Sequence, residues 1–288
     1  MTETSRTSTT PASAPGARAP LRARAEILSN QVESGANRRL VVRVPDWPGS
    51  GPGQFLMLSP GALSAVSRTD PLLPRPMAIY RERAGSGSSE VEVLYKVSGR
   101  GTSLLAEAEP GQLLSVVGPL GCGFSELASG ARAILVGGGT GIASLYGLAA
   151  AALGRGARVS VLLGARSAGE LMAEADFCEL GVDLQVATED GSGGHRGLVT
   201  ELLEALLDGE SGAPPTVFAC GPTPMMRRCA EIAEARSLSC VVSLENRMAC
   251  GFGVCLGCAV PVAAGGYGLV CREGPVFDAG DVVWEGLP

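Results

Sequence analysis

Histidine is almost absent from this sequence of 288 residues, which has a single one, His195. It lies in the polar stretch 190–196, where a solvated loop residue is a better interpretation than a catalyst. A hydrolase that uses serine, histidine and an acid is therefore disfavoured, because its histidine must be held between the other two groups.

Positive charge is also in short supply. The chain has 23 Lys and Arg against 29 Asp and Glu, which gives a net charge of −6. Proteins that hold nucleic acid electrostatically carry a basic surplus, so we expect no nucleic-acid partner. The nine cysteines are an odd number in a long chain. That number argues against a secreted disulfide framework and favours the reducing cytoplasm.

Segments typical of secreted and membrane proteins are missing as well. Residues 1–20 are rich in Ser, Thr, Ala and Pro and have no apolar core, so they predict a disordered tail and not a secretory signal. The 22 residues 133–154 carry no charge, but the glycines at 137–141 interrupt them. A strand, a glycine-rich turn and an alanine-rich helix explain this stretch better than a membrane span, so we expect no membrane association.

The most informative residues present are four cysteines near the end of the chain. Cys250, Cys255, Cys258 and Cys271 follow the spacing C-x4-C-x2-C-x12-C. Structural zinc usually takes two close pairs of cysteines, whereas a C-x4-C-x2-C loop with a distant fourth cysteine is typical of a [2Fe-2S] cluster. Gly251 and Gly253 would let the backbone of the loop approach the inorganic sulfide. The spacing therefore favours a [2Fe-2S] cluster, with zinc or four unrelated buried cysteines as alternatives.

Short β-like runs separated by Gly and Pro fill the first half of the chain. They lie at 40–44, 54–58, 91–97 and 113–117. Several short strands at this spacing predict a small antiparallel barrel.

Two motifs fall within this predicted barrel. Arg75, followed by Pro76, offers a guanidinium suited to a diphosphate beside a chain that proline keeps extended. The segment 96–102 runs from a strand through a glycine turn into the start of a helix, where backbone N–H groups can bind phosphate. Each motif is weak by itself, because an Arg-Pro pair is usually only a turn.

The second half alternates strands and helices, which predicts a parallel sheet with ligands at the carboxyl ends of its strands. We expect strands at 133–136, 158–163, 184–187, 217–220 and 240–244, and helices at 143–153, 170–179, 199–207 and 224–235. The glycines that follow the first strand would let a pyrophosphate approach the backbone.

Together these motifs resemble the ferredoxin–NADP⁺ reductase superfamily, in which an R-P-x-S segment and a G-x-G-T turn hold FAD and a G-x-G-T-G loop holds the pyridine nucleotide. This chain has Ala78 where the superfamily usually has Ser. For FAD the resemblance implies Arg75, Pro76, Met77, Ala78, Leu94, Tyr95, Lys96, Gly101 and Thr102. For the nucleotide it implies Gly137, Gly138, Gly139, Thr140, Gly141, Gly221 and Pro222, with Cys220 beside the nicotinamide. Cys220 could equally be a core residue at the end of its strand.

With the four-cysteine loop added, the chain from about residue 21 to 284 resembles one family, the electron-transfer subunits of NAD-linked dihydroorotate dehydrogenase. After the predicted tail (1–20), the resemblance implies an antiparallel FAD-binding β-barrel (21–127), an NAD-binding α/β domain (128–245) and a [2Fe-2S] module (246–288). It also implies a partner, an FMN-bearing catalytic subunit, in a heterotetramer of two copies of each. Electrons from dihydroorotate would cross the cluster and FAD to NAD⁺, as a step of pyrimidine biosynthesis.

Two rival functions stay open. A flavin and iron–sulfur subunit of an NAD(P)H:ferredoxin or sulfide-type oxidoreductase would share all three modules, and a non-enzymatic redox adaptor would need only the cluster. Arg166, after the second strand of the parallel sheet, could bind the 2′-phosphate of NADP, whereas an acid there would favour NAD. We predict NAD, because one arginine does not make a phosphate pocket.

Overall fold

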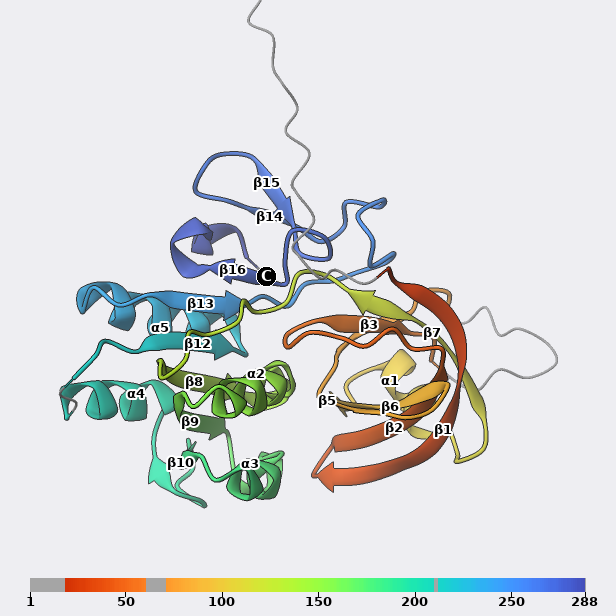
Figure 1. Cartoon of the computed structure of the whole chain (residues 1–288), viewed down its shortest axis with the longest axis horizontal. Helices are drawn as coiled ribbons and strands as arrows, with labels where there is room; N and C mark the ends of the chain where they lie inside the picture. The colour runs from red at the N-terminus through yellow and green to blue at the C-terminus, as the bar shows by residue number, and fades with distance from the viewer. Residues whose placement is uncertain (1–18, 61–70, 210–211, 288) are drawn as a thin grey trace, which may run out of the picture.

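The computed structural model describes residues 19–60, 71–209 and 212–287. The predicted disordered tail, apart from its last two residues, lies outside these ranges. Two sheets dominate the structure, one antiparallel and one mainly parallel, and they lie side by side with the C-terminal segment over both (Figure 1). No helix in the described ranges combines the length and the apolar character needed to cross a membrane.

The antiparallel sheet has the strand order β4-β3-β7-β1-β2-β6-β5 and curls into a half-barrel, which confirms the predicted architecture (Figure 1). Its strands are β1 Leu21–Ser34, β2 Asn37–Pro45, β3 Phe55–Leu58, β4 Arg75–Ala78, β5 Arg81–Ala84, β6 Ser88–Lys96 and β7 Leu113–Leu120, with helix α1 Arg100–Ala106 between the last two. Alternate residues of these strands point inward and bury an aliphatic core that includes Leu40, Val42 and Val93. β1 was not among the runs that the sequence predicted; two register shifts interrupt its pairing with β2 and let it bend with the sheet.

The parallel sheet has the order β11-β10-β9-β8-β12-β13-β16. Its strands are β8 Arg132–Gly138, β9 Arg158–Ala165, β10 Asp183–Thr188, β11 His195–Arg196, β12 Thr216–Cys220, β13 Cys240–Ser243 and β16 Val276–Asp278. All neighbours pair in parallel except β13 and β16. The central strand β8 is apolar throughout its middle, as expected for a strand that is covered on both faces.

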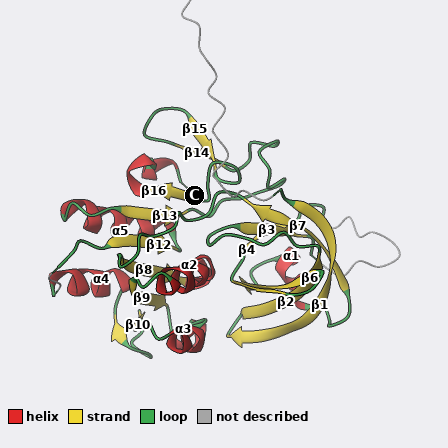
Figure 2. Cartoon of the chain, viewed as in Figure 1, coloured by secondary structure: helices red, strands yellow, loops and turns green. Residues whose placement is uncertain are grey.

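Helices cover both faces of this sheet (Figure 2). α2 Ala143–Gly154 and α3 Glu174–Leu180 pack in one buried cluster, and α4 Val199–Asp208 and α5 Thr223–Ala235 pack in another. The helix predicted over 170–179 starts later than expected. A 3₁₀ turn, η2 Ala168–Glu170, comes first, and Ala173 then takes a left-handed backbone (φ 61°) that separates the turn from α3.

The C-terminal segment is tied to both sheets. It contains the hairpin β14 Ala259–Pro261 and β15 Tyr267–Leu269, and two 3₁₀ turns, η3 Ala279–Asp281 and η4 Trp284–Gly286. Its strand β16 extends the parallel sheet through β13, and Cys122, just after β7, donates its backbone N–H to Gly274 (2.6 Å). The segment that the sequence marked as a separate module thus shares a sheet with the nucleotide-binding half.

Candidate functional site

A cavity of about 270 Å³ lies where the curled sheet faces the parallel sheet. Its walls include residues of β4 and β6 and one residue of α1, which are far apart in the sequence. Among the residues predicted for FAD, it is lined by Arg75, Pro76, Met77, Ala78, Leu94, Tyr95, Lys96 and Thr102. The remaining residue, Gly101, lies against the Arg75 guanidinium, because a Cβ on Gly101 would be 2.5 Å from Arg75 Nε. The two weak motifs therefore meet, which supports FAD binding by this cavity, here called the flavin cavity.

A larger cavity of about 610 Å³ opens at the carboxyl ends of β8, β9, β10 and β12. This is the edge at which ligands bind to open parallel sheets. Among the residues predicted for the nucleotide, it is lined by Gly138, Gly139, Thr140, Gly221 and Pro222. We call it the nucleotide cavity.

The other two predicted glycines serve the packing of the loop. Gly141 passes the end of β12 so closely that a Cβ there would be 2.4 Å from the carbonyl oxygen of Cys220. At Gly137 a Cβ would meet the Ile142 side chain at 3.1 Å, a tight contact that a small shift of that side chain would relieve. A side chain at Gly141 would push the glycine turn away from the end of β12.

Cys220 lies behind the cavity walls. Its side chain is buried, and among the described residues it is not one of those that line either cavity. Burial and the nearby Glu245 raise the pKa of the Cys220 thiol to about 12. Hydrogen bonds from Ser144 and Ser243 act in the opposite direction but are outweighed. Those two serines do line the flavin cavity, so Cys220 contacts that wall from the core side. A neutral thiol that supports the wall fits this position better than a reactive one.

The flavin cavity has two neighbours. Lys96, Thr140 and Glu245 line it together with the nucleotide cavity, so the two cavities are contiguous. Asn246 and Met248, from the segment that leads into the four-cysteine loop, line it on another side. Sequence reasoning missed these two residues, although their place just before Cys250 was an available signal.

The four-cysteine loop lies against the curled sheet. Gly251 has a left-handed backbone (φ 84°), and a Cβ there would be 2.6 Å from the Met57 side chain of β3. The glycine is therefore required both for the turn and for the close approach to the flavin-binding sheet.

The donors in this loop suit an anionic cluster. Partial burial raises the pKa of the Cys250 thiol, but hydrogen bonds from the backbone N–H groups of Cys255, Phe252 and Val254 outweigh it and bring the pKa to about 6. The thiolate is the form that ligates metal, and such N–H groups also stabilise the sulfurs of iron–sulfur clusters. Cys258 and Cys271 form a buried pair, in which the Cys271 N–H donates to Cys258 Sγ (3.4 Å).

The thiols of this loop stand in two pairs, Cys250 with Cys255 and Cys258 with Cys271. In the described ranges, no three Cys, His, Asp or Glu side chains converge closely enough to hold a metal ion. The donor set and the amide-lined turn nevertheless match a [2Fe-2S] cluster, which spreads its four thiolates over two irons.

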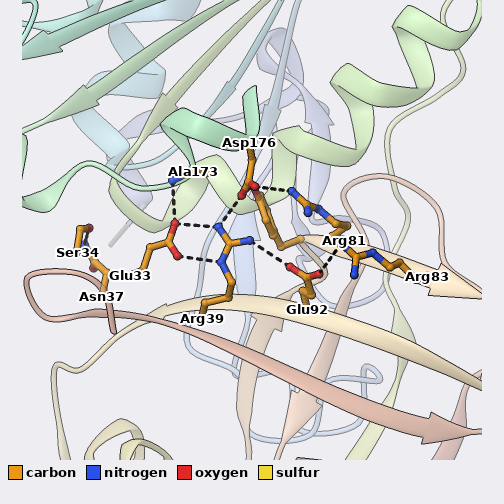
Figure 3. A network of polar contacts seen from close by, with 10 residues as sticks. Glu33, Ser34, Asn37, Arg39, Arg81, Arg83, Glu92, Ala173 and Asp176 are labelled. Atoms are coloured by element: carbon orange, nitrogen blue, oxygen red, sulfur yellow. Dashed lines mark hydrogen bonds and ion pairs between the residues drawn. The ribbon is translucent and has the colours of Figure 1, made fainter. Parts of the chain in front are cut away.

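A network of charged side chains joins the curled sheet to α3 (Figure 3). Arg39 bonds both oxygens of Glu33 (2.8 Å each), contacts Glu92 (3.2 Å) and reaches Asp176 of α3 (2.5 Å). Arg81 binds the second Asp176 oxygen at 2.8 Å. Although burial raises the pKa of Asp176, hydrogen bonds from Tyr80, Arg39 and Arg81 lower it below its usual value. This network, here called the polar joint, holds the two halves that form the cavities.

The single histidine lies outside these cavities. His195 is exposed, as expected, but it stands on the two-residue strand β11 and not in a loop. Its Nε2 is 2.6 Å from a carboxylate oxygen of Glu201.

Comparison with protein families gives two matches. Residues 245–283 match the iron–sulfur cluster binding domain of dihydroorotate dehydrogenase B, and residues 135–231 match the oxidoreductase NAD-binding domain. The first match contains all four cysteines, and the second contains the glycine loop and Cys220.

Whole-chain relatives agree with these matches. The electron transfer subunit of dihydroorotate dehydrogenase B (NAD⁺) from Bacillus caldolyticus is 41% identical over 236 residues, which cover 81% of this chain and 86% of that protein. A probable subunit of the same kind from Methanopyrus kandleri is 38% identical, with 88% of each chain covered.

Solved structures show the same fold. An NADH-dependent reduced ferredoxin-NADP oxidoreductase superposes with a TM-score of 0.79 and 30% identity over 91% of both chains. An Amycolatopsis cytochrome P450 reductase superposes with a TM-score of 0.66 and 21% identity, with 80% of this chain and 71% of that chain covered, and supports the fold alone.

Proposed function

We infer that this chain, which belongs to the family of dihydroorotate dehydrogenase B electron transfer subunits, carries electrons from a dihydroorotate-oxidising catalytic subunit to NAD⁺. The reaction is a step of pyrimidine biosynthesis. We place it in the cytoplasm, because an odd number of cysteines argues against a secreted disulfide framework.

One observation carries this proposal: the flavin cavity touches both other sites. It meets the cysteine segment at Asn246 and Met248, and it meets the nucleotide cavity at Lys96, Thr140 and Glu245. An electron relay needs this order, with the two-electron cofactor between the one-electron cofactor and the nucleotide. When bound, the cluster supplies single-electron transfer, and FAD converts pairs of electrons into the hydride that NAD⁺ accepts.

The chain's own residues perform binding and placement. Arg75 would neutralise the FAD diphosphate, and the 138–140 turn would receive the nucleotide pyrophosphate at the end of β8. Lys96 and Thr140, which line both cavities, would contact both the flavin and the nucleotide. Each of these assignments rests on the lining of the cavities and on the family resemblance.

The catalytic partner would dock where the four-cysteine loop is exposed. Phe252, Val254 and Leu256 are 56%, 74% and 62% exposed and lie within three residues of the exposed Cys255 in the sequence. Exposed apolar side chains beside a cofactor ligand mark a contact surface for another protein. We propose that the partner carries FMN and that two copies of each subunit assemble into a heterotetramer.

The ferredoxin-linked alternative has one observation in its favour. The solved structure that superposes over 91% of this chain is that of a reduced ferredoxin-NADP oxidoreductase. Its 30% identity is below the 41% of the Bacillus relative, and we retain it as the second candidate.

The order of the relay can be tested with Cys255→Ser. We expect this variant to lose iron and acid-labile sulfide together, to keep FAD, and to reduce a dye with NADH as the parent does. Dihydroorotate-dependent reduction of NAD⁺ in the presence of the FMN subunit should fall at least a hundredfold. Cys178→Ser, at an exposed cysteine on α3, is the matched control.

Three results would contradict the proposal. One is stoichiometric zinc in the parent protein, and another is coupled NAD⁺ reduction that survives in Cys255→Ser. The third is reduction of ferredoxin by NADPH with no response to dihydroorotate and the FMN subunit, which would favour the second candidate.

A further inference from the structure

The turn after β9 is held by the other half of the molecule. The side chain of Asn37, at the start of β2, is buried, and its Nδ2 donates to the backbone carbonyl of Glu170 (3.1 Å). Gly35, in the β1–β2 hairpin, faces Gly169 so closely that a Cβ on Gly35 would be 2.9 Å from the Gly169 carbonyl oxygen. The hairpin of the flavin-binding sheet therefore fixes the backbone position of Glu170.

The Glu170 carboxylate points into the nucleotide cavity between two cations. Its Oε2 lies 3.4 Å from Lys96 Nζ and 3.5 Å from Arg166 Nε, and all three side chains line the cavity. Arg166 is the residue that left the choice between NAD and NADP open at the sequence level. In the structure its charge is already paired with a carboxylate.

The strand order of the parallel sheet indicates which part of a nucleotide this carboxylate would contact. β8 carries the glycine turn for the pyrophosphate, and β9 is the next strand outward. In doubly wound sheets an acid after this second strand bonds the 2′-hydroxyl of the adenosine ribose, whereas an arginine there receives the 2′-phosphate of NADP. Here both residue types are present, and Glu170 pairs with the arginine.

We propose that Glu170 is the residue that makes this site select NAD over NADP. Its carboxylate accepts a hydrogen bond from the ribose 2′-hydroxyl, repels a 2′-phosphate, which carries roughly two negative charges, and occupies Arg166. This inference rests on the proposed function, and it assigns the nucleotide specificity within it to one residue.

Binding of nucleotide fragments by the FAD-loaded protein tests the assignment without the partner. The probes are 5′-AMP and adenosine 2′,5′-bisphosphate, with calorimetry as the readout. Glu170→Gln keeps the size of the side chain and its ability to bond a hydroxyl, but it removes the charge and releases Arg166. We expect it to raise the affinity for the bisphosphate at least tenfold and to change the affinity for AMP less than threefold. The ratio of kcat/KM for NADPH over NADH in dye reduction should rise by the same factor.

Two further variants identify the groups involved. Adding Arg166→Ala to Glu170→Gln should remove most of the gain, because the released guanidinium is the expected phosphate ligand. Glu189→Gln is the matched control, since Glu189 lines the same cavity just after the neighbouring strand β10. A bisphosphate affinity that Glu170→Gln leaves within twofold would overturn the proposal, and so would an equal gain in Glu189→Gln. Either failure would leave the relay order untouched, because these measurements need neither the cluster nor dihydroorotate.

Discussion

Two joints hold the halves of this molecule together. One is made of apolar side chains and the other of charged side chains. The joint under the four-cysteine loop, here called the apolar joint, is a single buried cluster. It contains Phe55, Met57 and Leu120 of the curled sheet, strands of the parallel sheet, and Val260 and Val270 of the C-terminal segment. The polar joint at α3 consists of charged groups that are 7–22% exposed.

The difference follows from what each joint has to fix. Apolar packing has no preferred direction, but it fills space at high density, so it sets a distance and resists separation. Charge-assisted hydrogen bonds contribute less net stability to the fold, because desolvation of the charged groups opposes them. Their directional geometry, however, allows only one alignment of the two surfaces. The apolar joint thus suits the fixed distance between cluster and flavin, and the polar joint suits the alignment of α3 and the Glu170 turn with the flavin-binding sheet.

The largest stability effect is expected from breaking the apolar joint with Leu120→Ala. Leu120 is 5% exposed and lies beside the backbone of Gly251 in the cysteine loop. Truncating a leucine in a packed core costs about 2–5 kcal/mol in the free energy of unfolding. Urea unfolding should show this loss, while the matched control Leu256→Ala, at an exposed loop tip, stays within about 0.5 kcal/mol of the parent. Equal stabilities of the two variants would show that the loop is not part of the core.

The second effect concerns the polar joint, which Asp176→Asn breaks at its centre. The variant leaves two arginines facing a neutral amide. Removing one partner of a buried ion pair costs roughly 3–5 kcal/mol, and solvent screening at these partly exposed groups reduces our expectation to about 1–3 kcal/mol. The same urea experiment measures it. Glu26→Gln, which breaks the exposed pair of Glu26 with Arg43, should change the stability by less than about 0.5 kcal/mol. A control as damaging as Asp176→Asn would contradict the distinction between the joint and ordinary surface charge.

The third effect separates cofactor binding from both joints. Arg75→Ala removes the guanidinium from the flavin cavity, where charge-assisted hydrogen bonds to a diphosphate are each worth about 1.5–3 kcal/mol. We expect FAD affinity to fall tenfold or more, while unfolding of the FAD-free protein is unchanged. Arg43→Ala, on the same sheet, is the control. FAD that stays bound to Arg75→Ala through extensive dialysis would show that this residue is not a phosphate ligand.

Features that depend on contiguous motifs were predicted well from the sequence. The Arg75 and Gly101 segments, the glycine turn after β8 and the four-cysteine loop are each contiguous motifs, and the structure brings the first two together in the flavin cavity. Many of the strands were also predictable, because their apolar residues alternate or run continuously, whereas β1 and short strands such as β5, β11 and β16 were not predicted.

What the sequence could not predict depends on contacts between distant residues. Glu170 looked like the start of a helix, and only its bond with Asn37, 133 residues away, places it in the nucleotide cavity. The sequence contains no signal for the polar joint, since no spacing links Arg39 to Asp176. The start of α3 was missed because the left-handed backbone at Ala173 is imposed by packing and not by a glycine or asparagine.

The smallest effect is a difference in pH dependence between the two joints. The bond with Arg39 holds the pKa of Glu33 below its usual value, and the pKa of Asp176 is lowered as described above. A carboxyl whose folded pKa is lowered contributes stability above its unfolded pKa, about 4, and loses that contribution as the pH falls through the folded value. The stability gap between the parent and Asp176→Asn should therefore shrink between roughly pH 5 and pH 3, whereas the gap between the parent and Leu120→Ala should stay constant, because the side chain that is truncated has no titratable group. All samples should carry Cys255→Ser, so that acid-labile sulfide does not complicate the unfolding curves. If the difference in unfolding free energy between the parent and Asp176→Asn is the same at pH 6 and pH 3, the polar joint is held by shape and not by charge.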